Sequence, residues 1–427
     1  MPSFLPTDPV VLAGTVVTTL ATHFDPQARG AAIAYWERES ARRQEVADAV
    51  KRLPDDTVVS LVFALQADPS DPEVHHRLYD RLTEAARHRA DPETETLFDL
   101  AWQVECVSRI GYHMGPGYRA DGYADMTADA LLALPRPEGA DDAGAGAGTG
   151  ASTEVLIVIP FQDRGPRRRL RNVLACLFAL QDQSAPRSSY RVVLVESDEV
   201  PRHRAALAPL VDTYCFAPKS GLFNKSWAVN VGVVNAPGRP GILCVLDADV
   251  LVDRDFVARN VARFRTPGTM GHLSYRDMWC LDEAATSWAI EERLVRRADE
   301  ADRDHLRAFL VRRPPGCCVW CRTSAFHRVH GMDERFEGWG GEDNDFLYRM
   351  DVYAALDHYD DPLLHMHHPS SGVLRDDGQV INAHIPALSW SPTTPIGDRL
   401  RFAGTVPGAG AAAGSGRGPA GSEAQPS

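Results

Sequence analysis

The sequence lacks three features that would place it in a membrane or on a polyanion. No apolar stretch reaches the roughly 20 residues that cross a bilayer, and the start of the chain has no basic segment typical of a signal peptide. Lysine is almost absent and the formal net charge is −13, which argues against nucleic acid or an anionic membrane as the main partner. We therefore expect a cytoplasmic protein, and we attribute the many Arg, Ala, Gly and Pro residues to the codon bias of a GC-rich bacterial genome.

The sequence also lacks a cysteine pattern typical of a disulfide-rich protein or a complete metal site. The eight cysteines are scattered along the chain, and several lie inside apolar runs. Such usage is typical of a reducing compartment, where cysteine behaves as a small apolar residue. Cys318 and Cys321 have the spacing of half a metal or redox site, but no second pair completes it. Their strand-like apolar surroundings favour core packing.

Composition divides the 427 residues into four segments. From about residue 25 the first segment has apolar residues at helical spacing, with Asp-Pro-Glu helix starts at 71 and 91. It predicts an all-helical accessory domain for acceptor binding or homo-oligomerisation. The second segment is a Gly/Ala-rich flexible linker, and the fourth is a disordered tail of similar composition. In order, the predicted segments are 1–136, 137–153, 154–403 and 404–427.

The third segment alternates apolar runs with amphipathic stretches. Such alternation predicts βαβ units, and hence an α/β domain whose mostly parallel central sheet is flanked by helices. In sheets of this kind the ligand lies beyond the carboxyl ends of the strands. The predicted strands are 155–159, 191–195, 214–216 and 242–246, and the predicted helices are 169–180 and 224–234.

Two carboxylates follow the last of these strands, on either side of Ala248. Asp247 and Asp249 suit a divalent cation, Mg²⁺ or Mn²⁺, that bridges a diphosphate. A DxD triplet alone is weak evidence, but its place at a strand end strengthens it. His365 and His367 lie in an extended segment, so we expect both to point to one side and complete a mixed site that favours Mn²⁺. A pH-sensitive surface cluster is the alternative.

The stretch FEGWGGEDNDFLYR, residues 336–349, has the strongest catalytic pattern. Glycines on both sides of Trp339 allow positive φ and a close approach to a ligand. Glu342 and Asp343 stand where this loop enters a helix. A solvated helix N-terminus is the ordinary explanation for such acids, but an aromatic residue between glycines indicates a substrate-contacting lid that carries a carboxylate general base.

Rings and cations stand beside two other strand or helix ends. Phe161 with Arg164, and Phe223 with Lys225, offer a ring to stack on a base and a cation for a phosphate. Each pair is weak evidence by itself, because a phenylalanine beside a strand end is more often part of the core.

Taken together, the motifs resemble the β-1,4-galactosyltransferase and chondroitin-polymerase type of glycosyltransferase. The resemblance covers about residues 155–370. It implies a GT-A fold and transfer from a UDP-sugar to an acceptor hydroxyl with inversion at the anomeric centre. The segments that carry it are IPFQDR (159–164), FNKSWAVNVG (223–232), LDADV (246–250), residues 315–346 with GWGGEDND, and HMHHP (365–369).

The resemblance also implies residue roles. Asp343 would be the general base, with Glu342 beside it on acceptor or donor hydroxyls. The metal would be held by Asp249, His365 and His367, with His368 as an alternative to His367. The remaining donor-binding residues would be Pro160, Phe161, Gln162, Arg164, Phe223, Asn224, Lys225, Asp247, Ala248, Trp339 and Gly340.

Four departures from the family pattern leave the donor sugar and acceptor open. Gln162 stands where Arg is usual, Asn344 replaces a third acid, and Gly316-Cys317 replaces a Gly-Gly pair. The stretch from Asn260 to Pro315 is also longer than the family pattern. Two other functions remain as alternatives. An inactive nucleotide-sugar or carbohydrate-binding module would not need both Asp249 and Asp343. A sugar nucleotidyltransferase would need a phosphate loop richer in glycine than the one after the first strand.

Overall fold

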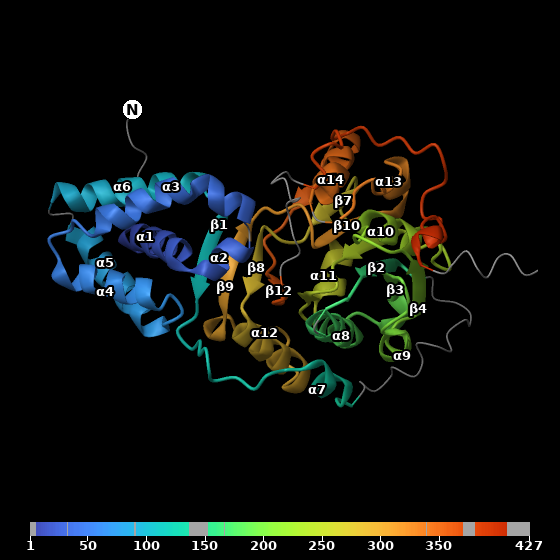
Figure 1. Ribbon diagram of the computed structural model, residues 1–427, viewed down its shortest axis with the longest axis horizontal. Helices are drawn as coiled ribbons and strands as arrows, with labels where there is room; N and C mark the ends of the chain where they lie inside the picture. Colours follow the sequence, from blue (N-terminus) through green and yellow to red (C-terminus); the bar gives the residue numbers. More distant parts are fainter. Residues whose placement is uncertain are drawn as a thin grey trace, which may run out of the picture.

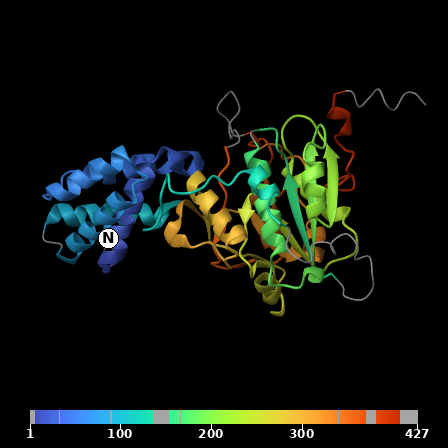
Figure 2. The same cartoon turned by 90° about the horizontal axis from the view of Figure 1, so that it is seen from below.

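In a computed structural model of the protein, the N-terminal helices and the part built on two sheets lie side by side (Figures 1 and 2), and the chain has two hydrophobic cores. One core belongs to the N-terminal helices and the other to the sheets that follow them. The structure describes residues 6–31, 33–88, 91–135, 153–165, 167–338, 340–369 and 381–407.

The N-terminal part is a bundle of helices, as the sequence predicts. Its first helix begins well before residue 25, in the uncharged stretch that opens the chain. Both Asp-Pro-Glu helix starts are confirmed: Asp71 accepts from the amide of Glu73 at 2.8 Å, and Asp91 accepts from the amide of Thr94 at 2.8 Å. The helices are α1 (Pro9–Phe24), α2 (Pro26–Ala31), α3 (Ile33–Val50), α4 (Asp56–Ala67), α5 (Pro72–His88) and α6 (Pro92–Val107).

The prediction that residues 1–136 are all helical is wrong at one element. Strand β1 (Ile110–Met114) pairs antiparallel with β9 (Arg307–Arg312), so the N-terminal segment contributes to a sheet of the second part. A five-residue strand has little local signal, because its partner lies about 200 residues further along the chain. The helix α7 (Ala128–Leu132) then packs against α8 (Arg168–Gln181). The expected homo-oligomerisation through the helical bundle stays a prediction.

The second part confirms the predicted α/β class. Its larger sheet has the order β11-β7-β10-β5-β2-β3-β4, and the four predicted strands are neighbours in it that pair in parallel. Helix α10 (Lys225–Val234) packs closely on this sheet, because a Cβ on Gly232 would lie 2.5 Å from Val158. The strands are β2 (Val155–Phe161), β3 (Tyr190–Asp198), β4 (Thr213–Pro218), β5 (Ile242–Leu246), β7 (Gly271–Leu273), β10 (Cys318–Arg322) and β11 (Asp357–His358).

A second sheet, of order β1-β9-β8-β12-β6, lies between the bundle and the larger sheet (Figure 1). It pairs β6 (Val250–Leu251) with β12 (Leu363–His365), so the end of the DxD motif lies beside the histidine segment. Strand β8 (Asp277–Leu281) leads into α12 (Glu283–Ile290). The remaining helices are α9 (Arg204–Leu207), α11 (Phe256–Arg263), α13 (Thr323–Arg328) and α14 (Glu342–Tyr353).

The linker predicted at 137–153 falls almost entirely outside the described residues, as do residues 408–427 of the predicted tail. The first residues of that tail are placed: Ser220 Oγ donates to the carbonyl of Thr405 at 2.6 Å. Cys318 and Cys321 are buried in β10 as free thiols, which confirms core packing. Among the described residues, no helix combines the length and apolar character needed to cross a bilayer.

Candidate active site

Four segments far apart in the sequence meet beyond the carboxyl end of β5. They are the DxD motif after β5, the start of α10, the start of α14, and the residues after β12. Backbone hydrogen bonds hold the first of them in place. The amide of Asp247 donates to the carbonyl of Cys317 at 2.8 Å, and the amide of Met366 donates to the carbonyl of Asp249 at 2.8 Å.

One carboxylate and two imidazoles form a cluster with the spacing of a metal site. The Nε2 atom of His368 lies 3.1 Å from Asp249 Oδ2, and that of His365 lies 3.5 Å from Asp249 Oδ1. One ligand atom from each residue falls within 4.8 Å of the others. Asp249 Oδ1 is buried and has no hydrogen-bond partner, so it is free to accept a cation.

His367, which we expected beside Asp249, lies elsewhere. Its Nδ1 is 2.8 Å from Glu283 Oε2, and its amide donates to Thr286 Oγ1 at 2.8 Å. The expectation assumed that the extended backbone continues through residue 367. Strand β12 instead ends at His365, so the alternation of side chains stops there. The structure therefore brings His368, the alternative ligand, to the cluster in place of His367.

The charges in this cluster fit a cation. Burial alone would raise the pKa of Asp249, but the imidazoles of His365 and His368 lower it, so the carboxylate is ionised. Burial lowers the pKa of His365 to about 4, which leaves that ring neutral and able to bind metal through a nitrogen. One carboxylate and two imidazoles favour Mn²⁺ over Mg²⁺.

A second cluster lies beside the first and centres on Lys225. Its ammonium is 2.8 Å from Asp247 Oδ1 and 2.9 Å from Asp343 Oδ2, and its side chain is only 11% exposed. Burial alone would lower the pKa of Lys225, but Asp247 and Asp343 raise it well above its usual value. The lysine therefore pairs with both carboxylates, and the diphosphate contact expected for it stays a prediction.

Glu342 and Asp343 lie in the first turn of α14, where the predicted glycines have the predicted conformation. Gly340 and Gly341 have φ of 96° and 99°, so the chain turns sharply into the helix. Burial raises the pKa of Glu342 to about 7, and its Oε2 has no hydrogen-bond partner. Trp339 lies outside the described residues.

Gly316 explains how Asp343 reaches this position. A Cβ on Gly316 would clash with Asp343 Oδ2, so the absence of a side chain leaves space for the carboxylate. Tyr275 fixes the loop, because its hydroxyl donates to the carbonyls of Pro314, at 3.1 Å, and Gly316. Cys317 has φ of 68° and places its sulfur 3.1 Å from that of Met278.

Two of the residues expected on the donor side, Gln162 and Arg164, hold neighbouring loops. Arg164 donates to Asp198 and to two backbone carbonyls at 2.8–3.1 Å, and Gln162 donates to the carbonyl of Ser197 at 2.9 Å. Phe161 is 2% exposed and packs against His203, which matches the core alternative. The rest take these places: Pro160 in β2, Asn224 as the N-cap of α10, Ala248 and Phe223 partly buried against the core.

Asn382 is a site residue that the motifs did not indicate. Its Nδ2 donates to the carbonyl of Gly340 at 2.8 Å, and its Oδ1 accepts from the amide of Glu337 at 3.3 Å. It therefore holds the glycine turn on both sides of residue 339. A single asparagine about 40 residues downstream has no motif of its own, so only the folded chain identifies it.

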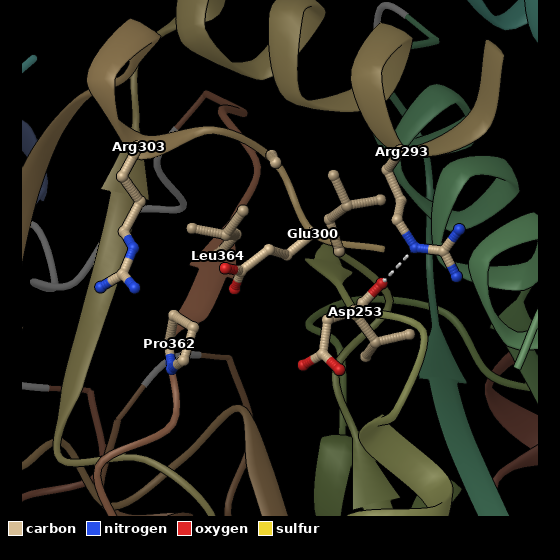
Figure 3. Close-up of a pocket in the computed structure, with 9 residues that line it drawn as sticks. Asp253, Arg293, Glu300, Arg303, Pro362 and Leu364 are labelled. Atoms are coloured by element: carbon tan, nitrogen blue, oxygen red, sulfur yellow. Dashed lines mark hydrogen bonds between the residues drawn. The ribbon is translucent and has the colours of Figure 1, made fainter. Parts of the chain in front are cut away.

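The small cavity in Figure 3 is not a donor site. It measures about 20 Å³, the space of about one water molecule, and lies beneath β6 and β12 on the side of Leu251 and Leu364. Arg293 closes one wall by donating to the carbonyl of Val252 at 3.2 Å. A nucleotide sugar cannot fit there.

Comparison with known proteins gives one family match. Residues 311–355 match a family described as the N-terminal domain of galactosyltransferase. The matched segment contains β10, α13 and α14, and thus Gly316, Glu342 and Asp343. A search of curated proteins finds no match to this chain.

Solved glycosyltransferase structures match parts of the chain. TarS from S. aureus is 12% identical (TM-score 0.35), over 50% of this chain and 60% of that one. A mutant Drosophila β1,4-galactosyltransferase 7, in complex with manganese, UDP-Gal and xylobiose, is 15% identical (TM-score 0.31), over 50% and 71%. A mannosyltransferase from Pyrobaculum calidifontis, with GDP-Man and Mn²⁺, is 17% identical (TM-score 0.32), over 56% and 62%. These partial alignments assign no residue roles to this chain.

Proposed function

We propose that this protein is a metal-dependent, inverting glycosyltransferase of the GT-A type. It transfers a sugar from a nucleotide sugar to an acceptor hydroxyl, and the expected donor is a UDP-sugar. The observation that carries the proposal is the meeting of two clusters at one edge of the sheet. One cluster has a cation-binding donor set, and the other has a paired carboxylate, Asp343, that can accept a proton. The galactosyltransferase match over residues 311–355 supports the same reaction class.

Asp343 is the general base in this proposal. Its carboxylate takes the proton of the acceptor hydroxyl as the oxygen attacks the anomeric carbon, which requires a distance of about 2.6–3.2 Å. Lys225 holds Asp343 in place through the 2.9 Å ion pair. Gly316 leaves the space that the carboxylate occupies.

Asp249, His365 and His368 would hold a divalent cation, Mn²⁺ in preference to Mg²⁺. When bound, such a cation stabilises the charge that develops on the departing diphosphate, an effect of several kcal/mol. Asp247 stays next to Lys225, where it can accept hydrogen bonds from donor hydroxyls. Glu342, with its unpartnered Oε2, can bind a hydroxyl of donor or acceptor.

Substitution of Asp343 by Asn tests the assignment of the base. The amide keeps the size of the side chain but cannot take up a proton, so transfer falls by at least ~10²-fold while donor binding is retained. Asp351→Asn is the matched control, because Asp351 is an exposed carboxylate on the same helix. Near-normal transfer by Asp343→Asn would exclude Asp343 as the base.

The donor and the reaction class are tested on the unmodified protein. In a thermal-shift series of nucleotide sugars with and without Mn²⁺, we expect one donor to stabilise the protein, and more so with the metal. Turnover should then release a nucleoside diphosphate, and NMR of the product should show the inverted anomer. Release of pyrophosphate would indicate a nucleotidyltransferase, and donor binding without turnover a binding module.

A further inference from the structure

The two imidazoles of the metal cluster are separated by a short turn, residues 366–367. His365 ends β12, so the ladder to β6 and β8 fixes its backbone. His368 lies three residues further on, beyond the end of the strand. The position of its ring, 3.1 Å from Asp249, therefore depends on the conformation of the intervening turn.

Side chains from α8 and α12 hold this turn from several directions. The carbonyl of His367 accepts from Arg171 Nη2 at 2.8 Å and from Asn172 Nδ2 at 3.1 Å. Its amide donates to Thr286 Oγ1 at 2.8 Å, and its ring contacts Glu283 at 2.8 Å. Both the backbone and the side chain of His367 are thus fixed.

Glu283 joins these contacts into one unit. Besides His367, its carboxylate binds Arg171 Nη1 at 2.6 Å and also pairs with Arg168. Arg171 is the residue that holds the carbonyl of His367, so Glu283 fixes the turn directly through the ring and indirectly through the arginine. A carboxylate that orients ligands in this way affects metal affinity without touching the metal.

The helix that carries Glu283 is itself anchored. Asp282 caps α12 by accepting from the amide of Ala285 at 2.8 Å. The same carboxylate accepts from Arg307 Nη1 at 2.6 Å and from the hydroxyl of Tyr118 at 2.6 Å. Because this anchor is buried, the first turn of α12 is a rigid support for the histidine segment.

We propose that Glu283 is a positioning residue for the metal site, and that it sets the turn at 366–367 so that His365 and His368 face Asp249 together. The inference rests on the proposed function, because it takes the cluster of Asp249, His365 and His368 to be a cation site. It adds to that function a residue on a different element, which touches neither the cation nor the substrate.

Mn²⁺ titration of the protein without donor tests the inference. The dissociation constant for Mn²⁺, measured by calorimetry or by the EPR signal of free Mn²⁺, should rise by about 10–100-fold in Glu283→Gln. Glu291→Gln is the control, because Glu291 pairs with the exposed Arg296 at the other end of the same helical segment. That variant should bind Mn²⁺ like the unmodified protein.

Thr286→Val is the second variant, in case Glu283→Gln perturbs folding. It removes the contact to the amide of His367 with almost no change in volume, and we expect weaker Mn²⁺ binding here too. Unchanged Mn²⁺ affinity in folded Glu283→Gln and Thr286→Val would overturn the inference and leave the proposed function intact. If the unmodified protein bound no Mn²⁺, the metal site of the proposed function would fail, and the inference with it.

Discussion

Two buried groups of charges in this protein differ in how completely they are paired. The interface cluster (Asp25, Tyr112, Asp282 and Arg307) joins the helical bundle to the second sheet. Arg307 pairs with Asp25 and, at 2.6 Å, with Asp282, and donates to the hydroxyl of Tyr112 at 2.8 Å. Within the described residues, none of the buried side-chain N and O atoms of this cluster is without a partner.

The site cluster (Lys225, Asp247, Glu342 and Asp343) is less deeply buried than the interface cluster and is incompletely paired. Lys225 forms ion pairs with two carboxylates, and Glu342 Oε2 has no hydrogen-bond partner. Burial raises the pKa of Asp247 and that of Glu342. The chain therefore keeps excess negative charge here, at a cost in stability.

The difference separates a structural network from a candidate ligand site. Charges that serve the fold are matched by partners within the chain, because an unpaired buried charge destabilises it. Charges that await a ligand keep free acceptor atoms, such as Glu342 Oε2 and Asp249 Oδ1. Removal of the cation from the interface cluster and removal of the unpaired carboxylate from the site cluster should consequently have opposite effects on stability.

Arg307→Ala should have the largest effect. It leaves the carboxylates of Asp25 and Asp282 buried without their cation, a change that typically costs about 3–5 kcal/mol of unfolding free energy. Chemical denaturation followed by circular dichroism measures it. Arg29→Ala, which breaks an exposed ion pair with Glu37, is the control and should change stability little. A similarly small change in Arg307→Ala would contradict the structural role of the interface cluster.

Gly316→Ala should have an intermediate effect, on activity and not on stability. The new methyl group would clash with Asp343 Oδ2, and the flexible carboxylate can turn away at little cost to the fold. Displacement of a catalytic group by about 1 Å can reduce the rate ~10²-fold. We expect kcat to fall by about that factor with an unchanged melting temperature. Full activity would show that Asp343 need not occupy this position during transfer.

Glu342→Gln should have the smallest effect and the opposite sign. The pKa of Glu342 rises from about 4.5 to about 7 on folding, so the folded protein binds more protons than the unfolded chain between these values. Unfolding free energy therefore falls as the pH rises from about 4.5 to about 7. Glu342→Gln removes this contribution, so the variant should be more stable than the unmodified protein at pH 8 and gain nothing at pH 4. Chemical denaturation at both pH values measures the difference in unfolding free energy between the variant and the unmodified protein. An equal difference at pH 4 and pH 8 would contradict the prediction.

The sequence by itself determined the α/β class, the four parallel strands and the turn into α14. These features depend on residues that are neighbours in the sequence. They are continuous apolar runs, glycines that permit positive φ, and acids at strand or helix ends. Asp249 was identified in this way, because it follows the predicted strand 242–246. His365 was identified as one of two histidines in an extended segment, and the strand that it ends, β12, was not predicted.

Only the tertiary structure decided which side chains meet. His368 lies beside Asp249 in place of His367 because strand β12 ends at His365, so the alternation of side chains does not continue to residue 367. The length of this strand depends on its pairing with β6 and β8. The pairing of β1 with β9, and the contacts of Glu283 with the histidine turn, join residues 80 to 200 positions apart. Such contacts depend on how the sheets pack together, so no local pattern contains them.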